Sequence, residues 1–265
     1  PSRCAGPGQE FLDHRNFHHG DDLRAVNWRA YLRLDKMFLK MFQVEPRVPV
    51  RLLLDTSASM MIGEGAQRKF NYARRLAAAF CYVALVRLDM MTIQPFREKL
   101  ADAFSCGGGR HRFWPAADYL KSLQADSATN FLEVSRQFIA EYPQRGLVIV
   151  ISDFLSDEDC LKPLQYLADF GHELLLVQVW TEEDRTPPWS GELMLTDAES
   201  GTQREISFDE AARQSYTVAF DEYARSIERL ALRNGGRYVG LSTRVAIEDA
   251  IFQATQLNPA ALRAS

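Results

Sequence analysis

The chain has 265 residues, of which 46% are hydrophobic and 25% are charged. This is ordinary globular composition, long enough for one large domain or two small ones with a sizeable core. The formal net charge is −4, from 31 Lys and Arg against 35 Asp and Glu, and the interspersed charges argue against a nucleic-acid-binding surface.

Residues 1–47 are dense in charge and contain few apolar runs. Gly20-Asp21-Asp22 is typical of a turn or helix cap, and residues 23–42 mix aromatic and basic side chains without a clean period. We expect these residues to form an arm that packs on the main domain. Pro46 and Pro49 then mark a break before the first strong strand.

From residue 48 to residue 256, apolar runs of strand length alternate with helical patterns. Strands are expected at 50–54, 90–96, 146–151, 173–180 and 237–241. Helices are expected at 70–84, 119–123, 131–142, 211–233 and 245–256. This alternation predicts an α/β fold, a three-layer doubly wound arrangement around a mostly parallel sheet, with residues 257–265 as a C-terminal tail.

Residues 191–208 interrupt the alternation. The short segments ELMLTD and REISF flank the turn-like sequence Glu199-Ser200-Gly201, which predicts a hairpin inserted at the edge of the sheet.

Nothing in the chain predicts a membrane span or a disulfide framework. The longest apolar run, residues 76–86, is bounded by arginines and too short to cross a bilayer, so it predicts a core helix. The cysteines form no CxxC pair and are expected to be thiols in a reducing cytosol: Cys4, Cys81, Cys106 and Cys160. The first residue is Pro1, which leaves open a preceding segment with a signal or anchor.

Oxygen-bearing side chains follow two of the expected strands. Asp55, in LLLDTSASM, ends one expected strand. Asp153, in ISDF, lies at the same end of another. The carboxyl ends of parallel strands meet at one crevice, where two carboxylates would repel each other unless a cation lies between them. The hydroxyls of Ser57 and Ser59 are hard, neutral ligands that suit Mg²⁺ or Mn²⁺.

LLLDTSASM is similar to the DxSxS signature of the metal-ion-dependent adhesion site in von Willebrand factor A domains. In those domains the other ligands are a threonine on a separate loop and an aspartate after a later strand. Thr129 in ATNF resembles that threonine, and Asp153 resembles that aspartate. The resemblance implies a von Willebrand factor A-like, Rossmann-like fold and one metal site, made of Asp55, Ser57, Ser59, Thr129 and Asp153.

The whole chain resembles one bacterial branch of that superfamily, domain of unknown function 58. Its members carry a segment GxEFxxxRxYxxGDDxRxIDW, and residues 8–28 here read GQEFLDHRNFHHGDDLRAVNW. The resemblance continues through DTSASM, KFNYA, the glycine loop, ISDF and a D-x-E-x-G motif at Asp197, Glu199 and Gly201.

What the resemblance implies is binding without catalysis. In similar domains the ion keeps one coordination position for an acidic side chain of a partner. Genes of this branch commonly neighbour those of MoxR-type AAA+ ATPases, so the resemblance implies an adaptor or cochaperone whose Mg²⁺ or Mn²⁺ recruits an acidic residue of an ATPase or of a client protein.

Several alternatives stay open for these residues. Asp55, Ser57 and Ser59 could form a helix cap after the strand. Asp126, Ser127 or Asn130 could act in place of Thr129.

The alternative activity is a Mg²⁺-dependent phosphoester hydrolase of the haloacid dehalogenase type, with Asp55 as its nucleophile. The second acid of the DxDx[TV] pattern is Ser57 here, and no lysine is expected in the position that such enzymes need near Asp153.

Two other clusters suggest ligands without a matching motif. His14, His18 and His19 near Asp21 and Asp22 match no metal-binding spacing and predict a solvated loop. The glycine loop CGGGRHR at 106–112 lacks the phosphate-binding pattern GxxxxGK[ST]. We expect it to be a mobile loop beside the metal site, with Arg110 and Arg112 available to an acidic partner.

Overall fold

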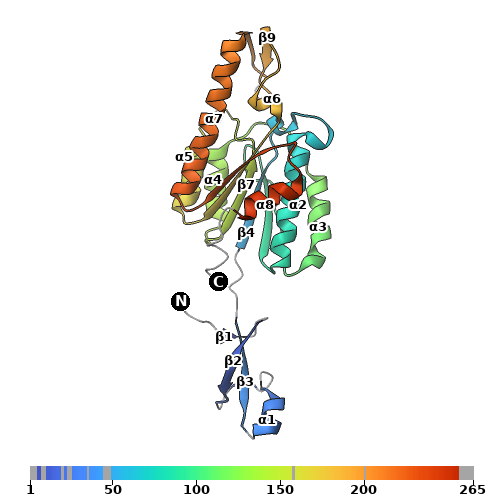
Figure 1. Ribbon diagram of the computed structural model, residues 1–265, viewed down its shortest axis with the longest axis vertical. Coiled ribbons are helices and arrows are strands. Elements are labelled where there is room, and N and C mark those ends of the chain that lie inside the picture. The colour runs from blue at the N-terminus through green and yellow to red at the C-terminus, as the bar shows by residue number, and fades with distance from the viewer. Residues whose placement is uncertain are drawn as a thin grey trace. The chain divides into compact units, whose positions relative to one another are not determined.

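A computed structural model describes residues 5–6, 10–18, 21–22, 26–34, 36–43, 49–156, 159–199 and 201–256 (Figure 1). The chain divides into two compact units: Pro1–Arg47 with Ala261–Ser265, and Val48–Ala260. Among the described residues, no helix combines the length and the apolar character that crossing a bilayer requires.

The smaller unit contains an antiparallel sheet with strand order β1-β3-β2, which the sequence analysis did not predict. Its elements are β1 (Ala5–Gly6), β2 (Glu10–Asn16), α1 (Trp28–Leu34) and β3 (Phe38–Gln43). Arg15 forms a two-pronged ion pair with Asp21 at 2.7 and 2.9 Å. His18 is exposed, while His19, Gly20 and residues 23–25 lie outside the described residues. Packing of this unit on the main domain stays a prediction.

The larger unit is built on a six-stranded sheet with strand order β11-β8-β7-β4-β5-β6. All neighbouring strands are parallel except β6, which runs antiparallel to β5 at the edge. The strands are β4 (Pro49–Asp55), β5 (Met90–Phe96), β6 (Phe104–Gly107), β7 (Leu147–Ser152), β8 (Glu173–Trp180) and β11 (Arg237–Ser242). The spatial order of these strands is that of the doubly wound dinucleotide-binding folds. β5 and β6 lie on one side of β4, and the later strands β7, β8 and β11 lie on its other side.

Helices cover both faces of this sheet (Figure 1). One face carries α2 (Lys69–Val86), α3 (Phe113–Ser122) and α8 (Ile247–Gln256); the other carries α4 (Phe131–Glu141), α5 (Leu161–Asp169) and α7 (Glu210–Arg233). Because side chains alternate along a strand, Leu52 and Leu54 pack on the first face and Leu53 packs on the second. The predicted α/β fold with a mostly parallel sheet is confirmed.

Most predicted elements are confirmed. The larger differences between prediction and structure are at two helices with a proline in the first turn and at one edge strand. The strands expected at 90–96 and 173–180 have the predicted bounds, but α3 begins six residues before the expected 119, and α5 and β6 were missed. Pro115 and Pro163 lie in the first turns of α3 and α5, where a backbone N–H has no helical partner, so proline does not interrupt these helices. β6 is a four-residue strand without an apolar run.

The predicted hairpin exists but does not extend the large sheet. β9 (Gly191–Thr196) and β10 (Gln203–Phe208) pair only with each other in a separate two-stranded sheet. Their side chains are mostly exposed, with Met194 60% and Leu195 42% accessible, so the hairpin has no buried face with which to pack as an edge. The sheet edges are β6 and β11 instead.

The glycine loop lies at the opposite end of the sheet from the candidate site, which corrects the expectation above. Gly107 pairs with Met90, the first residue of β5, because β6 runs antiparallel to its neighbour. The loop therefore leaves the sheet at the amino ends of the parallel strands. Arg110 and Arg112 belong to a short 3-10 helix, η4 (Arg110–Arg112), at that end.

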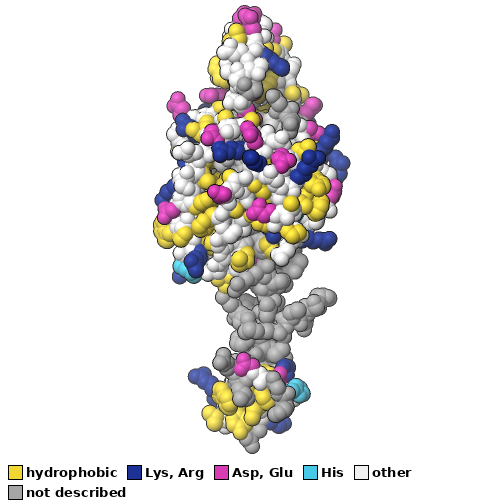
Figure 2. All heavy atoms as spheres, turned by 180° about the vertical axis from the view of Figure 1, so that it is seen from behind, with side chains coloured by type: hydrophobic (Ala, Val, Ile, Leu, Met, Phe, Trp, Pro, Cys, Tyr) yellow, Lys and Arg dark blue, Asp and Glu magenta, His cyan; other side chains and the backbone are white. Residues whose placement is uncertain are grey.

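The surface of the described residues carries both signs of charge. On the face shown in Figure 2, acidic and basic side chains are interspersed with apolar ones. This face therefore presents no extended field of one sign that would attract a polyanion.

Candidate metal site at the strand ends

The candidate site lies where two neighbouring parallel strands end. Asp55 is the last residue of β4, and Asp153 directly follows β7. The two strands pair with Leu54 opposite Ile151, so both aspartates leave the sheet at the same edge. The chain then continues to α2 on one face and toward α5 on the other, which opens the crevice where sheets of this type bind ligands.

Asp55 is a buried carboxylate that neutral groups hold in place. It is 1% exposed, its Oδ1 accepts a hydrogen bond from the Ser57 backbone N–H at 2.9 Å, and its Oδ2 accepts one from the Ser152 hydroxyl at 2.5 Å. Burial and the negative charge of Asp153 raise the pKa of Asp55 to about 7. Within the described part of the chain, no Lys, Arg or His forms an ion pair with it.

The two serines of the DxSxS segment lie beside this carboxylate. Ser57 precedes the 3-10 helix η2 (Ala58–Met61), and its hydroxyl is 3.0 Å from the hydroxyl of Ser59. Ser57 is completely buried and Ser59 is 8% exposed. Because the two hydroxyls share a single hydrogen bond, each keeps a lone pair for a further interaction.

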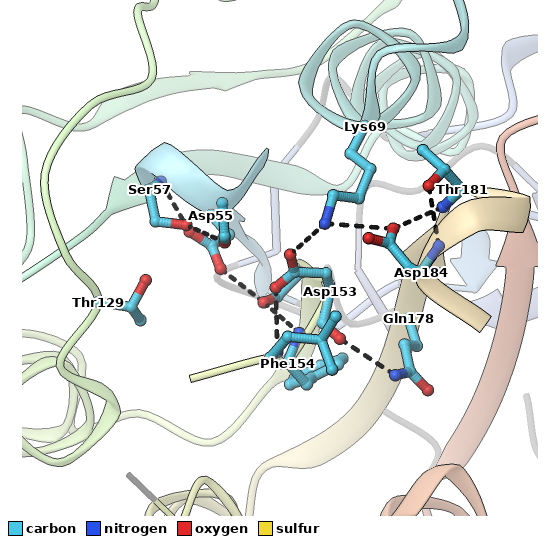
Figure 3. Close-up of polar contacts among 12 residues, drawn as sticks. Asp55, Ser57, Lys69, Thr129, Asp153, Phe154, Gln178, Thr181 and Asp184 are labelled. Carbon is cyan, nitrogen blue, oxygen red and sulfur yellow. Dashed lines mark hydrogen bonds and ion pairs between the residues drawn. The ribbon is translucent and has the colours of Figure 1, made fainter. Parts of the chain in front are cut away.

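Backbone hydrogen bonds hold the loop of Thr129 against the loop that follows β4. The Ala58 N–H donates to the Ser127 carbonyl at 2.8 Å, and the Asp126 N–H donates to the Thr56 carbonyl at 3.0 Å. Figure 3 shows Thr129 on the same side of the strand ends as Asp55, Ser57 and Asp153.

The residues considered in place of Thr129 have other roles. The Asn130 side chain caps α4 by accepting a hydrogen bond from the Glu133 N–H at 2.8 Å. Asp126 is exposed and forms an ion pair with Arg97. Ser127 adopts a positive φ of 65°, and its hydroxyl turns to Asp126 at 3.4 Å.

Thr129 bonds to an acidic side chain from the hairpin. Its backbone N–H donates to Glu199 Oε2 at 3.0 Å, and its hydroxyl donates to Glu199 Oε1 at 3.3 Å. Glu199 is half-buried, and burial together with the charge of Asp153 raises its pKa, although its hydrogen bonds to Thr129 oppose the rise. Thr129 is a predicted ligand, and its hydroxyl donates to the carboxylate of Glu199, which is not among the predicted ligands.

A buried lysine lies beside Asp153 (Figure 3). The ammonium of Lys69, at the start of α2, is 2.6 Å from Asp153 Oδ2 and 3.3 Å from Asp184 Oδ2, and its side chain is 0% exposed. Burial lowers the pKa of Lys69, but the charges of Asp153 and Asp184 outweigh burial and raise it. The expectation that no lysine lies near Asp153 is therefore wrong.

The donor set fits a hard divalent cation. When ionised, Asp55, Asp153 and Asp184 carry three negative charges against one positive charge on Lys69. Two negative charges remain, which one Mg²⁺ or Mn²⁺ would balance with the carboxylate and hydroxyl oxygens that such ions prefer. No group of three or more His, Cys, Asp or Glu side chains in the described ranges is arranged to hold a metal, so the candidate depends on this mixed set of oxygens.

Sequence reasoning missed Lys69, Asp184 and Glu199 as members of the site. A signal was present for Lys69, which lies on the same helical stripe as the buried Tyr72, Ala73 and Leu76. Glu199 belongs to the D-x-E-x-G motif, which gave no indication that it would reach Thr129. Asp184 lies in the capping box of the short helix α6 (Glu182–Arg185), where its backbone N–H and carboxylate pair with Thr181.

Comparison with known proteins gives a family match but no described activity. The model of the family described as "Protein of unknown function DUF58" matches residues 13–225. "Uncharacterized protein Rv1480" of Mycobacterium tuberculosis is 27% identical over 250 residues, which are 90% of this chain and 76% of that protein. "Uncharacterized protein MAV169" of Mycobacterium avium is 31% identical over 100 residues, which are 38% of this chain and 59% of that protein.

Solved structures with a similar arrangement include two proteins from Bacteroides species and one VWA domain. The conserved hypothetical protein BatB from Bacteroides thetaiotaomicron has a TM-score of 0.48 and 19% identity, covering 78% of this chain and 96% of that chain. An aerotolerance-related membrane protein from Bacteroides fragilis has a TM-score of 0.45 and 18% identity, covering 78% and 98%. The SpRpn10 VWA domain has a TM-score of 0.46 and 10% identity, covering 78% and 95%. At these scores and identities, the matches say nothing about the chemistry of the site.

Proposed function

We propose that this chain, which belongs to the family described as protein of unknown function DUF58, is a non-catalytic, metal-dependent protein-binding module. Its metal site would consist of Asp55, Ser57, Ser59, Thr129 and Asp153, with Mg²⁺ or Mn²⁺ as the ion. The protein would use this ion to bind an acidic residue of a partner.

The observation that supports this proposal best is the buried Asp55 carboxylate. A buried charge is stable only with a partner, and the positive charge of Lys69 is already shared between Asp153 and Asp184. Among the described residues, Asp55 accepts hydrogen bonds from neutral donors alone, and the paired hydroxyls of Ser57 and Ser59 lie beside it. A divalent cation would supply the missing charge, and Ser57 and Ser59 could each offer it a lone pair of the hydroxyl oxygen.

We propose a MoxR-type AAA+ ATPase or a client protein as the partner. The partner's carboxylate would complete the coordination of the ion, so the ion itself would form the contact between the two proteins. This choice of partner follows the family resemblance. The role would be that of an adaptor or cochaperone in the cytosol, where the free thiols of Cys81, Cys106 and Cys160 would stay reduced.

Metal binding is tested by thermal unfolding with and without Mg²⁺. At a concentration about 100 times the Kd, a ligand specific for the native state adds about 2.7 kcal/mol, which raises the Tm of a chain of this size by roughly 5 °C. Asp55→Ala should abolish the rise. The control is Asp118→Ala, which removes an exposed carboxylate from α3 and should keep the full rise. An equal rise in wild type and Asp55→Ala would contradict the proposed site.

Partner binding is tested by affinity capture from the source cell. Wild type should retain a set of proteins that chelator releases and that Asp55→Ala does not retain. Identical sets for the two proteins, with and without chelator, would show that the ion does not mediate the contact.

One observation favours the second candidate, a Mg²⁺-dependent phosphoester hydrolase with Asp55 as nucleophile. Lys69 contacts Asp153, and such enzymes need a lysine near their later aspartate. The same lysine is fully buried, and both oxygens of Asp55 already accept hydrogen bonds, which disfavours attack on a phosphoester. Turnover of p-nitrophenyl phosphate by wild type and its loss in Asp55→Ala would replace the binding proposal with this one.

A further inference from the structure

The turn of the β9–β10 hairpin brings one acidic side chain to the candidate site. The Glu199 N–H donates to Asp197 Oδ1 at 3.1 Å, and the Gly201 N–H donates to the Asp197 carbonyl at 3.0 Å. Gly201 has a φ of +69°, a conformation that glycine adopts without strain. The D-x-E-x-G motif therefore encodes a turn with Glu199 inside it.

The carboxylate of Glu199 reaches across 70 residues of sequence to Thr129. Both of its oxygens are used, one by the Thr129 N–H at 3.0 Å and one by the Thr129 hydroxyl at 3.3 Å. Side chains on the two strands of the hairpin are mostly exposed, whereas Glu199 is half-buried. The hairpin thus places a single acidic side chain against a predicted ligand of the ion.

We propose that Glu199 is an acidic ligand that the chain itself supplies to the ion, in the position that a partner's carboxylate would otherwise take. This inference rests on the proposed function. A partner gains access only when the hairpin turn moves away from Thr129, so the hairpin regulates partner binding at this site.

Electrostatics supports a cation between Glu199 and the strand-end aspartates. Glu199 brings a further negative charge toward Asp153, and Asp55 has no cationic partner among the described residues. Partly buried negative charges repel each other, and a cation between them removes this repulsion. The ion would therefore stabilise the closed hairpin as well as the strand ends.

The test compares two charge-matched variants of the whole chain, Glu199→Gln and Glu205→Gln. Glu205 lies on β10 of the same hairpin and is exposed, so both variants remove one negative charge from the hairpin but only one alters the contact with Thr129. Each protein is loaded with Mn²⁺, and water-proton relaxation reports how many exchangeable waters the bound ion holds. The probe is a blocked Gly-Gly-Ser-Glu-Ser-Gly-Gly peptide, with the corresponding Gln peptide as its negative control.

In Glu199→Gln we expect bound Mn²⁺ to give higher relaxivity than in wild type, because water replaces the carboxylate. The acidic peptide should lower this relaxivity as it binds. Its apparent Kd for Glu199→Gln should be about tenfold lower than for wild type, because the peptide no longer competes with the Glu199 carboxylate and its charge-assisted hydrogen bond to Thr129. Glu205→Gln should match wild type.

Three outcomes would overturn the inference in different ways. If Glu199→Gln has the same relaxivity and the same peptide affinity as wild type, Glu199 is not a ligand. The proposed function would stand in that case, because both proteins still bind Mn²⁺. Loss of Mn²⁺ from Glu199→Gln alone would make Glu199 an obligatory ligand that no partner displaces. No Mn²⁺ binding by wild type would overturn the inference and the proposed function together.

Discussion

Lys69 gives Asp153 a permanent positive partner, and Asp55 has no equivalent in the part of the chain that the structure describes. The ammonium of Lys69 is buried between Asp153 and Asp184 at hydrogen-bonding distance from the first and 3.3 Å from the second. The two aspartates of the candidate site are therefore different: one is paired within the fold, and the other depends on a proton or an ion. This difference separates the structural role of Lys69 from the binding role proposed for Asp55.

We expect Lys69→Met to destabilise the fold strongly. It leaves two carboxylates without their buried partner, and breaking a buried ion pair costs about 3–5 kcal/mol in the free energy of unfolding. Urea denaturation in chelator measures the loss. Added Mg²⁺ should restore part of it, because the ion supplies positive charge to the same group of carboxylates.

The matched control for this prediction is Lys121→Met. Lys121 is 3.3 Å from Asp118, but both side chains are more than 70% exposed, at 74% and 73%. An exposed pair of this kind contributes about 0–1 kcal/mol. Equal losses in the two variants would contradict the structural role of Lys69.

The start of α4 connects helix stability to the candidate site. Asn130 caps this helix and directly follows Thr129, so the cap also fixes the end of the loop that presents the threonine. Asp209 caps α7 in the same way, by accepting a hydrogen bond from the Ala212 N–H at 2.7 Å. The two caps are chemically similar but only one adjoins a predicted ligand.

Asn130→Ala and Asp209→Ala should each lower the free energy of unfolding by about 1 kcal/mol, which is the usual cost of losing such a cap. Only Asn130→Ala should also reduce the rise in Tm with Mg²⁺, because the Thr129 loop loses its anchor. Parallel thermal scans of both variants measure this. A normal Mg²⁺ response in Asn130→Ala would argue against Thr129 as a ligand.

The predicted elements succeed where a local pattern determines the structure. The apolar runs of β7 and β8 define both strands because a strand covered on two faces has no solvent-exposed side that would need polar residues. The start of α3 and the whole of α5 were missed, and each helix has a proline in its first turn, where proline is accepted although it disfavours a helix interior. The edge strand β6 was missed because it has no apolar run, and its pairing with β5 is a non-local contact.

The same distinction applies to the candidate site. Asp55, Ser57 and Ser59 follow one strand, so their proximity is local and could be predicted from sequence. The contacts of Lys69 with Asp153 and of Glu199 with Thr129 span 84 and 70 residues, and no local pattern encodes them. The hairpin could be predicted from its turn residues, but the direction in which that turn points could not.

All predicted ligands lie within one of the two compact units. Asp55 to Asp153 fall inside Val48–Ala260, and so do Lys69 and Glu199. This unit contains the six-stranded sheet and the helices on both of its faces. The proposed ion site therefore consists of residues from the larger unit.

A chain of residues 48–260 should unfold cooperatively and show the same rise in Tm with Mg²⁺ as the whole chain. The reason is that the core clusters on both faces of the sheet consist of residues from this unit. Circular dichroism during heating measures both properties. A truncated chain that folds but no longer responds to Mg²⁺ would show that the smaller unit contributes to the site.

The parallel pairing of β4 with β7 means that the proposed site forms well after Asp55 has been translated. Asp55 and Ser152 are hydrogen-bonded partners that lie 97 residues apart, so at about 5–20 residues per second roughly 5–20 s pass between their translation. Until β7 is made and docks on β4, the nascent chain has Asp55, Ser57 and Ser59 but lacks Asp153 beside them. Under the proposed function, a partner that recognises the ion would distinguish a finished sheet from an unfinished one and would leave incomplete chains unbound.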